Sequence, residues 1–483
     1  MAVAFQSRKR WRNHTGNQTV EPLRIYRPAT LAELQAIVRT AEADRTTVRA
    51  VGSGHSWSDV ALTTGYLVRT DRLSQPLEVD CLRRDRDGRP LVRVEAGMRI
   101  RALNELLADR GLALTQMGGY DAQTVAGVVS TSTHGSGLAL GAICDYVQTL
   151  DLVAAGGRVH RIERAAGPTD APAFARAHPD WALHQDDHVF DAALVNMGCM
   201  GVVYAATIAV EDAYWLTEVR ELSTWARVRG QLMAGLEGNR HYEVYLNLYP
   251  GEGGEHRCIV CRRNRTRDPG RRRPTDRLHR HWWLELASRS KVIPFLGNLV
   301  LDLSPASAPR RTDQMLGLLA DNEYSGPSYK VLNIGAANLL PAYSSEPAVP
   351  LDRHAEAIDA LIDVAARHRD LGSIYHTGLV ALRFVRESPA YLSMMHGRDT
   401  MTIELIQATQ TEGGYELLGA YEDALDELGA RPHWGQVNTL TGGRETLRRL
   451  YPEFDRWLEV HDELNPGRVF DSPFSRRVGI SGR

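Results

Sequence analysis

The chain has 483 residues, 43% of them hydrophobic, a length that suggests two to four domains with sizeable cores. Its 57 basic and 59 acidic residues leave a formal charge of −2, which gives no reason to expect nucleic acid or an anionic membrane as the main partner. Five cysteines cannot build a disulfide scaffold in so long a chain, and the odd number fits a reducing compartment.

The N-terminal residues 1–16 are basic, but no apolar stretch follows them, so we expect no signal peptide. The longest apolar run, residues 292–301, is interrupted by Pro294 and Gly297 and is too short to span a bilayer. We therefore expect a soluble, cytoplasmic protein.

The first elements that the sequence predicts are a helix and a strand. Thr30 and Glu33 form a capping box, and apolar residues then recur at helical spacing, which predicts a helix that ends near Asp44. Residues 46–51 predict a strand that runs directly into a glycine-rich segment. Further strands are predicted within residues 66–70, 91–97 and 147–155, and a second helix over residues 100–110. The pattern indicates an α+β domain.

The rest of the chain suggests a second domain and a returning tail. Residues 163–190 are rich in Ala, Pro and Asp, which predicts a surface insertion. Longer strands and helices with aromatic residues begin near Glu211. We therefore divide the chain into 1–212, 213–450 and 451–483, and expect the last segment to pack back on the first domain.

Gly52, Ser53, Gly54, His55 and Ser56 form the first pattern that points to a ligand. Glycines allow positive φ angles and bring backbone N–H groups close to a phosphate. Taken alone, the string fits a tight turn with a surface histidine equally well. A serine hydrolase is excluded here because no Gly-x-Ser-x-Gly elbow is present.

A second segment rich in glycine and hydroxyl groups begins about 65 residues later. It contains Gly118 and Gly119 and then residues 124–137, which offer hydroxyls and bare amides but no acid. This composition suits a pyrophosphate held without lysine. Taken alone, this segment would be explained by a plain Gly/Ser loop. Its occurrence at this distance from the first segment makes both patterns more specific to a phosphate-containing ligand.

Two further patterns are better explained without a site. Cys258 and Cys261 lack a second ligand pair at zinc spacing, so we interpret them as alternation within a strand and expect no metal. The arginine-rich residues 262–280 are typical of a solvated loop. Contact with an acidic substrate or partner stays open for them, and the overall charge disfavours nucleic acid.

Four residues near the C-terminus are candidates for chemistry. Arg383 and Glu404 lie on stretches whose alternation predicts neighbouring strands, where they could form a plain cross-strand ion pair. His376 and Gln436 are the other two, and Gln436 ends the motif HWGQ.

Five motifs in order carry a resemblance to a known family: GSGHSWSD, TVAGVVSTSTHGSG, GCMGVV, HWGQ and LNPGRVF. Together they resemble the vanillyl-alcohol-oxidase type of FAD-dependent oxidoreductase, in the branch of alditol, gulonolactone and arabinonolactone oxidases. The opening RNHTGN is similar to the Asn-Trp-x-Gly-Asn start of that branch. The resemblance covers residues 10–215 and 370–475. It implies an α+β fold with a two-part FAD-binding domain and a cap domain whose large antiparallel sheet forms the substrate site.

The resemblance also implies how FAD is held. His55 maps to the histidine that is joined to the flavin 8α-methyl group, and the backbone of residues 52–56 would hold the pyrophosphate. Relatives with two covalent bonds have a cysteine in the second segment, and this chain has none there, so we expect a single bond. The other residues placed at the flavin are Gly118, Gly119, Thr124, Gly127, Thr131, Ser132, Thr133, His134, Val202 and Val203.

The substrate side departs from the family pattern. Alditol oxidases place a serine, a glutamate, an arginine, a histidine and a lysine around the reacting carbon, and only the arginine survives here. A polyol site needs several hydrogen-bonding groups, since each hydroxyl left unpaired costs about 1–3 kcal/mol. The corresponding residues of this chain are Gly119, Ala381, Arg383, Glu404 and Gln436.

These residues suggest a covalent-FAD oxidase that takes a hydride from a CH–OH or CH–NH carbon of a small hydroxylated substrate and passes the electrons to O2. Arg383 would stabilise the negative charge that develops on the flavin, and Glu404 would act as general base or as counter-ion for a cationic substrate. His376 and Gln436 are weaker candidates. An alditol or sugar-lactone oxidase or dehydrogenase, and a non-redox binding protein on the same scaffold, are the alternatives. We expect no nucleic-acid or membrane partner, and the sequence does not give the oligomeric state.

Overall fold

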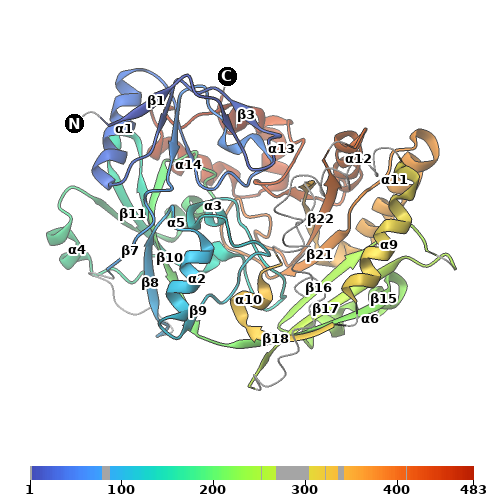
Figure 1. Ribbon diagram of the computed structural model, residues 1–483. Coiled ribbons are helices and arrows are strands. Elements are labelled where there is room, and N and C mark those ends of the chain that lie inside the picture. Colours follow the sequence, from blue (N-terminus) through green and yellow to red (C-terminus); the bar gives the residue numbers. More distant parts are fainter. Residues whose placement is uncertain are drawn as a thin grey trace.

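The computed structural model describes residues 3–78, 88–251, 253–267, 304–320, 322–334, 342–409 and 411–482. These residues form two parts that lie side by side (Figure 1). The first part carries a four-stranded sheet, a six-stranded sheet and two small two-stranded sheets, and the second carries one large sheet.

A four-stranded sheet and a six-stranded sheet build the first part. The smaller has the order β1-β4-β6-β5, and its strands β4, β6 and β5 run parallel. The larger has the order β12-β11-β10-β13-β8-β7 and is antiparallel except for the parallel pair β11 and β12. The strand bounds are β1 (Phe5–Ser7), β2 (Trp11–Arg12), β3 (Thr19–Val20), β4 (Arg24–Tyr26), β5 (Val48–Val51), β6 (Tyr66–Arg69), β7 (Pro76–Leu77), β8 (Leu91–Glu95), β9 (Leu112–Ala113), β10 (Val147–Val153), β11 (Val159–Glu163), β12 (Ala182–Gln185), β13 (Val202–Ala209) and β14 (Glu211–Asp212).

The first predicted helix and strand are confirmed. In α1 (Leu31–Ala43) the Thr30 side chain accepts a hydrogen bond from the Glu33 N–H, and the C-cap is Asp44. Four apolar residues at helical spacing, from Leu34 to Ala41, are buried. Strand β5 follows and leads into the glycine-rich segment, as the sequence predicts. The other helices of this part are α2 (Ile100–Ala108), α3 (Val125–Ser130), α4 (Ala171–Ala177) and α5 (Asp187–Leu194).

The second part is a nine-stranded antiparallel sheet covered by helices. Its order is β18-β15-β17-β16-β21-β22-β20-β23, and β19 also pairs with β22. The strand bounds are β15 (Trp215–Thr224), β16 (His241–Leu246), β17 (Arg257–Thr266), β18 (Asn322–Pro327), β19 (Ala342–Ser345), β20 (Pro347–Pro350), β21 (Val380–Val385), β22 (Thr400–Ala408) and β23 (Arg431–Pro432). The helices are α6 (Trp225–Glu237), α9 (Ala308–Leu319), α10 (Ser328–Leu332), α11 (His354–Gly372) and α12 (Gly414–Asp426).

Alternation along the central strands decides which side chains face the first part. Val244, Leu382 and Ile403 belong to the core that the sheet forms with α6, α11 and α12. Successive side chains of a strand point to opposite faces, so the neighbouring polar residues of these strands lie on the other face of the sheet. That face is the one available to the chemistry of the site.

The described part of the arginine-rich segment is not a solvated loop, and the prediction is wrong there. Residues 262–266 belong to β17, and Arg263 is buried. Residues 268–280, like the apolar run 292–301, lie outside the described residues. Cys258 and Cys261 lie in the same strand and pack into different cores, which confirms that they alternate within a strand.

The predicted surface insertion over residues 163–190 is only partly on the surface. Its strand β12 pairs with β11 and forms the edge of the six-stranded sheet. In α4, Phe174 is buried, with the guanidinium of Arg161 4.8 Å from its ring centre. The segment therefore extends the sheet and its core.

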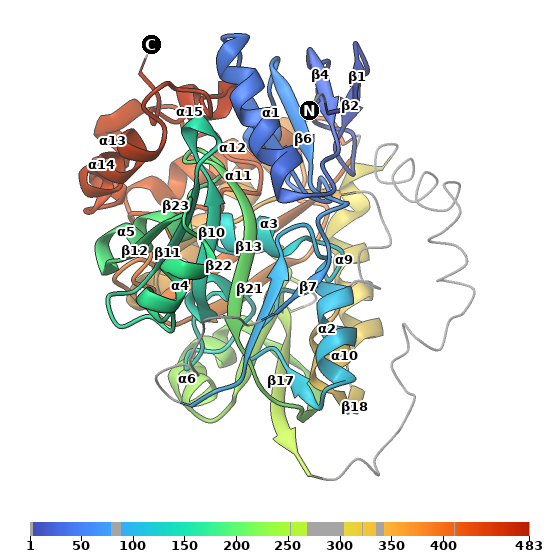
Figure 2. The same cartoon turned by 90° about the vertical axis from the view of Figure 1, so that its left-hand side faces the viewer.

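The C-terminal segment packs against the first part. Helices α13 (Gly443–Leu450), α14 (Phe454–Leu464) and α15 (Pro473–Arg477) lie beside the N-terminal elements (Figure 2). The Val48 N–H donates to the Val469 carbonyl at 2.7 Å. Buried Arg49 donates to the carbonyls of Phe470 at 3.4 Å and Met197 at 2.6 Å. The boundaries at residues 212 and 450 stay predictions.

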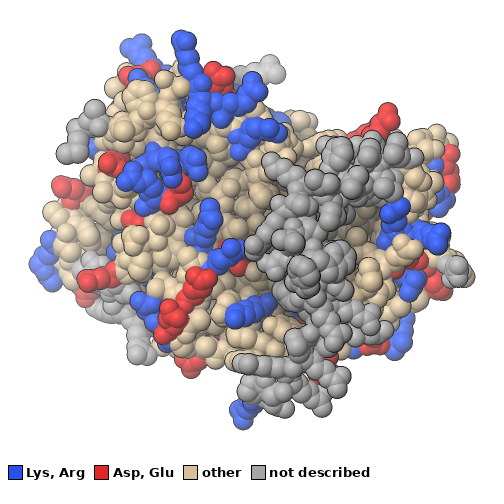
Figure 3. Space-filling model, viewed as in Figure 1, with Lys and Arg blue, Asp and Glu red and all other residues tan. Residues whose placement is uncertain are grey.

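Acidic and basic side chains are mixed over most of the face drawn in Figure 3, with basic residues denser over the N-terminal elements at the top. Among the helices that the structure describes, we find none with the length and apolar character needed to cross a bilayer.

Candidate active site

The two glycine-rich segments lie against each other at the edge of the first part. A Cβ on Gly52 would lie 2.1 Å from Thr124 Oγ1, so glycine is needed for this close approach. Gly54 has φ +72°, in the left-handed region that favours glycine. The Ser53 hydroxyl donates to the Ala122 carbonyl. The structure thus brings together the two motifs that the sequence places far apart.

His55 lies between two other rings. Its ring centre is 4.4 Å from that of His14 and 4.6 Å from that of Tyr120. Burial, with the nearby charges of His14 and Arg99, lowers the pKa of His55 to about 4. The imidazole is therefore neutral at neutral pH, the form in which a ring nitrogen is a nucleophile.

The N-terminal motif NHTGN holds the first segment in place. Asn13 Nδ2 donates to the Ser56 carbonyl at 3.0 Å, and Asn17 Nδ2 donates to the Trp57 carbonyl at 2.9 Å. The His14 N–H donates to the Gly54 carbonyl at 2.8 Å. These bonds fix the backbone around His55.

The polar side chains of the second segment have different structural roles. Thr124 caps α3 by accepting from the Gly127 N–H, and Thr131 donates to the Gly127 carbonyl. Ser132 forms a hydrogen bond of 2.7 Å with Ser393 inside the core. Thr133 lies beside Gly118, where an added Cβ would be 3.1 Å from Thr133 Cγ2.

The valines expected at the flavin are buried in β13. Val202 and Val203 pack into two different cores on opposite faces of the strand. Only their backbone is therefore placed to meet a ligand.

The two segments fit a bound FAD. Residues 52–56 and 124–137 contain no carboxylate, and they present backbone amides and hydroxyls next to each other. Such a nest of donors suits a pyrophosphate, since no negative side chain opposes its charge.

Arg383 is the centre of a charged cluster on the polar face of the large sheet. Its Nε donates to Glu243 Oε1 at 2.7 Å, and its Nη1 donates to Glu404 Oε2 at 2.7 Å and to Glu346 Oε1 at 3.3 Å. The three carboxylates hold the pKa of Arg383 well above its ordinary value, although burial acts in the opposite sense. The sequence-based pairing of Arg383 with Glu404 is confirmed, but the ion pair is part of a larger group.

A second arginine extends the cluster. Glu243 also accepts from Arg263 Nη1 at 2.9 Å, and Arg263 Nε donates to Glu218 at 2.5 Å. Burial alone would raise the pKa of Glu243, but Arg383 and Arg263 hold it below the ordinary value. Glu243 is therefore an ionised bridge between two guanidinium groups.

Glu404 is the carboxylate of this cluster with a raised pKa. Burial is the largest cause, and the neighbouring Glu346 adds to it, while Arg383 acts in the opposite sense. Glu404 Oε1 lies 3.3 Å from the Ser344 hydroxyl, which is also 2.8 Å from Gln436 Oε1. Gln436 Nε2 in turn lies 3.5 Å from Glu346 Oε2. Three of the predicted substrate-side residues, Arg383, Glu404 and Gln436, thus share one network.

His376 does not join this network. It is buried, and its backbone N–H donates to the Tyr249 hydroxyl at 2.8 Å. Its ring packs edge-on against Tyr421. Both tyrosines belong to the core beneath the helix-covered face of the sheet. Among the described contacts of His376, none reaches Arg383 or Glu404.

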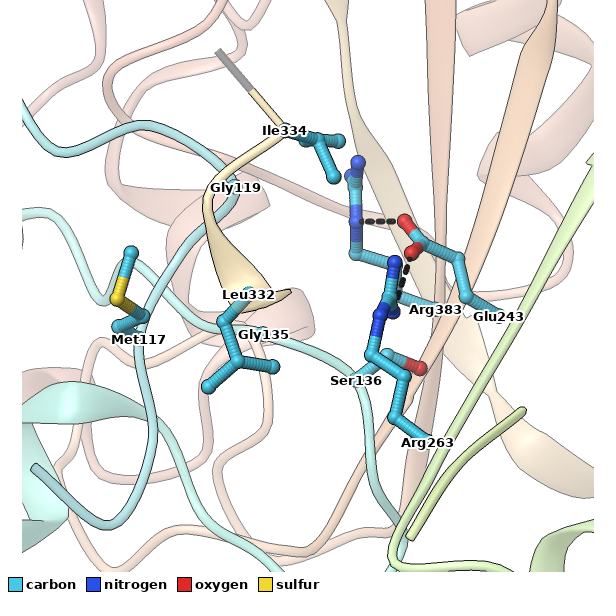
Figure 4. A pocket seen from close by; sticks show the side chains of 9 residues that line it. All are labelled: Met117, Gly119, Gly135, Ser136, Glu243, Arg263, Leu332, Ile334 and Arg383. Atoms are coloured by element: carbon cyan, nitrogen blue, oxygen red, sulfur yellow. Dashed lines mark hydrogen bonds and ion pairs between the residues drawn. The ribbon is translucent and has the colours of Figure 1, made fainter. Parts of the chain in front are cut away.

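A pocket lies between the second segment and this cluster (Figure 4). Arg383, Glu243 and Arg263 line one side, with Ser136 beside them, and Met117, Leu332 and Ile334 lie across from them. Gly119 and Gly135 complete the lining. The pocket is therefore charged on one side and aliphatic on the other.

Several residues of the site were not foreseen from the sequence. Glu243 is a single acid within the strand sequence HYEVYL, a signal that strand alternation could have revealed, whereas Glu346 lies between two strands and carries no such signal. Arg263 was hidden by the run of arginines around it. Ser344 and Ile334 carry no sequence signal for a site.

One group in the described residues has the composition of a metal site. Ligand-type atoms of His134, Glu346 and His433 lie within 4.8 Å of one another. However, His433 Nδ1 accepts from the Gly435 N–H at 3.0 Å, which leaves the proton of a neutral ring on Nε2 and blocks that atom as a ligand. Arg383 lies 3.3 Å from Glu346 and would repel a cation. The chemistry of this group does not fit a metal.

The fold and this site define a class of protein: FAD-dependent oxidoreductases of the vanillyl-alcohol-oxidase type, in which a cap sheet stands over the flavin-binding segments. Residues 22–163 match the family model for an FAD binding domain, and residues 206–478 match the model for D-arabinono-1,4-lactone oxidase. The chain belongs to the D-arabinono-1,4-lactone oxidase family. It is an FAD-dependent enzyme, as the motifs imply.

Curated relatives are similar along almost the whole chain. An L-gulono-1,4-lactone dehydrogenase of Mycobacterium tuberculosis is 29% identical over 97% of this chain and 98% of its own length. An alditol oxidase of a Streptomyces species is 28% identical over 96% of this chain and 97% of its own length. Cholesterol oxidase of Brevibacterium sterolicum has the same fold, with a TM-score of 0.77, 14% identity, and coverage of 99% of this chain and 97% of the other. The fold class predicted from the motifs is confirmed.

Proposed function

We propose that the protein is a covalent-FAD oxidase that takes a hydride from a CH–OH or CH–NH carbon of a small, neutral or amino-bearing hydroxylated substrate. The observation that carries this proposal is the contact of 2.7 Å between Glu404 and Arg383 beside the pocket. A carboxylate with a raised pKa next to a fixed cation is suited to take a proton from a substrate hydroxyl or ammonium group.

Bound FAD would supply the hydride acceptor and, through it, the transfer of electrons to O2 with release of hydrogen peroxide. His55 would hold it by one bond to the 8α-methyl carbon, and its neutral imidazole supports that role. The amides of residues 52–56 would bind the pyrophosphate.

The protein's own residues have distinct tasks in the reaction. Arg383 provides a fixed positive charge in the pocket, where it would stabilise the negative charge that the flavin gains with the hydride. Glu404 would take the hydroxyl proton at Oε1 or Oε2. Ser344 and Gln436 would orient Glu404, and Gly119 with Ile334 would exclude water from the aliphatic side.

The charge of the site supports a neutral or cationic substrate. Three carboxylates contact Arg383, so its positive charge is already compensated and is not free to pair with an additional anion. A substrate ammonium group close to ionised Glu404 would form a charge-assisted hydrogen bond, worth about 1.5–3 kcal/mol.

A dehydrogenase that passes its electrons to a carrier is the second candidate, since the Mycobacterium tuberculosis relative has that name. Gly118 favours the oxidase, because it has no side chain to screen the flavin from O2. A sugar-lactone or alditol oxidase remains the alternative on the substrate side, through family membership.

A screen for peroxide release tests the proposal. Purified protein is first precipitated with acid, and flavin that stays with the chain supports covalent FAD. The protein is then incubated with amino alcohols, simple alcohols, alditols, and gulono- and arabinono-lactones. Peroxide from amino alcohols or neutral alcohols is expected. Peroxide from the lactones alone would replace the proposal with the family activity, reduction of an added dye without peroxide would indicate a dehydrogenase, and a colourless protein would indicate a non-redox function.

A further inference from the structure

Three buried side chains behind Arg383 have no task in the function proposed above. Glu346 connects β19 to β20, His134 belongs to the second glycine-rich segment, and His433 follows β23. Their exposed fractions are 4%, 5% and 6%. Because charged and polar groups are costly to bury, this arrangement needs a reason beyond packing.

The three carboxylates around Arg383 differ in whether they contact a second cation. Glu243 has Arg263 as a second cation at 2.9 Å, and Glu346 has His134 Nε2 at 3.5 Å. Within the described residues, the cation in contact with Glu404 is Arg383. Glu404 thus depends on a guanidinium that two other carboxylates also contact.

His134 has acceptors at both ring nitrogens. Its Nδ1 lies 2.9 Å from the Gly135 carbonyl, which can only accept, so Nδ1 carries a proton. Its Nε2 lies 3.5 Å from Glu346 Oε1. A protonated Nε2 can donate to this carboxylate oxygen, whereas an unprotonated Nε2 cannot. His433 differs, because its Nδ1 accepts from the Gly435 N–H. Of the two rings, His134 is therefore the one whose Nε2 is placed to pair with Glu346.

We propose that Glu346, balanced by His134, is a positioning residue that holds Arg383 at the pocket and keeps Glu404 able to take up a proton. This inference rests on the proposed role of Glu404 as the base. The negative charge of Glu346 competes for Arg383 and repels a charge on Glu404, so that Glu404 binds a proton more readily than it would beside Arg383 alone. The groups that face Glu404 are Arg383 of β21, Glu243 of β16, Ser344 of β19, Glu346, and Gln436 beyond β23.

Two substitutions are expected to shift the titration of Glu404 in opposite directions. Glu346→Gln removes a like charge and lowers the pKa of Glu404. His134→Asn keeps a donor toward the Gly135 carbonyl but removes the positive charge that balances Glu346, and so raises the pKa of Glu404. A purely structural role would not give shifts of opposite sign.

The titration is measured on the FAD-loaded protein by infrared difference spectroscopy between pH 4 and pH 9. The band of protonated Glu404 is identified by its loss in Glu404→Gln. Glu422→Gln is the matched control: this glutamate is half-buried, but it contacts Ser345 and Thr439 instead of Arg383, and its removal should leave the Glu404 midpoint unchanged. Equal midpoints in wild type, Glu346→Gln and His134→Asn would overturn the proposal. Melting temperature and flavin content show which variants are folded, and either variant alone gives a shift of defined sign.

A kinetic measurement completes the test. With the substrate that gives the most peroxide, the acid limb of flavin reduction should move to lower pH in Glu346→Gln, and the maximal rate should fall about tenfold as Arg383 loses its fixed position. If the infrared shifts occur but no alcohol or amine is oxidised, the proposed function fails and the electrostatic role of Glu346 stands. If oxidation occurs and the shifts are absent, the inference alone fails.

Discussion

Ile334 occupies the space that a side chain at Gly119 would need. A Cβ on Gly119 would lie 2.6 Å from Ile334 Cγ1, and the Ile334 N–H donates to the Gly119 carbonyl at 2.9 Å. The motif comparison predicts that Gly119 corresponds to a serine at the substrate in alditol oxidases. In this chain Ile334 lies where a side chain at that position would be.

Gly119→Ser should therefore destabilise the protein by about 1–3 kcal/mol through overpacking. Ile334→Ala in the same chain should remove most of this loss, because it empties the contested space. Urea unfolding of the two single variants and the double variant measures the coupling. Additive effects would contradict the close contact. Xylitol should be a poor substrate of the wild type, and rapid peroxide release from it would show that the missing serine is not needed.

Glu404→Gln should lower the rate of anaerobic flavin reduction by on the order of 10²-fold or more, the usual contribution of a general base. In the wild type this rate should fall as the pH drops through the raised pKa of Glu404, because the base must be ionised to accept a proton. Stopped-flow reduction as a function of pH measures both. Glu422→Gln is the control, and a pH-independent wild-type rate would refute Glu404 as the base.

His55→Ala should bind FAD without a covalent bond, because much of the cofactor site is backbone. The intact denatured wild-type chain should carry the added mass of one FAD, and the variant should have the mass of the apoprotein. Mass spectrometry of both, with His188→Ala as a control outside the site, decides the point. Yellow wild-type protein with the apoprotein mass would disprove covalent attachment.

Gly118→Val should slow reoxidation of the reduced flavin by O2 about tenfold, which corresponds to about 1.4 kcal/mol of barrier. The added side chain starts 3.1 Å from Thr133 Cγ2 and would narrow the approach to the flavin, while anaerobic reduction should change little. Gly230→Val is a suitable control, because no atom apart from the backbone of its own helix lies within 4 Å of its Cβ position. A wild-type reduced flavin that persists in air for minutes would show that the enzyme is not an oxidase.

Asp145 should make the protein less stable as the pH rises from about 4 to about 6. Burial raises its pKa from 3.8 to about 6, so in this range the folded state keeps a proton that the unfolded chain has lost. The loss should reach about 2–3 kcal/mol. Urea unfolding of the wild type and Asp145→Asn at several pH values measures the difference between them. A difference that does not change with pH would contradict the raised pKa.

The sequence allowed the prediction of elements and pairs that depend on local patterns. The capping residues Thr30 and Glu33 located α1, and alternation placed Arg383 and Glu404 on adjacent strands. It did not predict the approach of Glu243 and Glu346, because that depends on the register of strands distant in the chain. Arg263 was misread because composition cannot distinguish a buried arginine from exposed neighbours. The contacts of Glu243, Glu346 and Arg263 are set by tertiary structure, which local sequence patterns do not reveal.

Arg49 ties the beginning of the chain to its end. It is buried in β5, directly before the glycine-rich residues 52–56, and it donates to the Phe470 carbonyl near the C-terminus. During synthesis, residue 470 leaves the ribosome only after the whole cap has been made. The first sheet therefore cannot reach its final packing while translation proceeds, and the cap has time to fold before the part of the chain that precedes it.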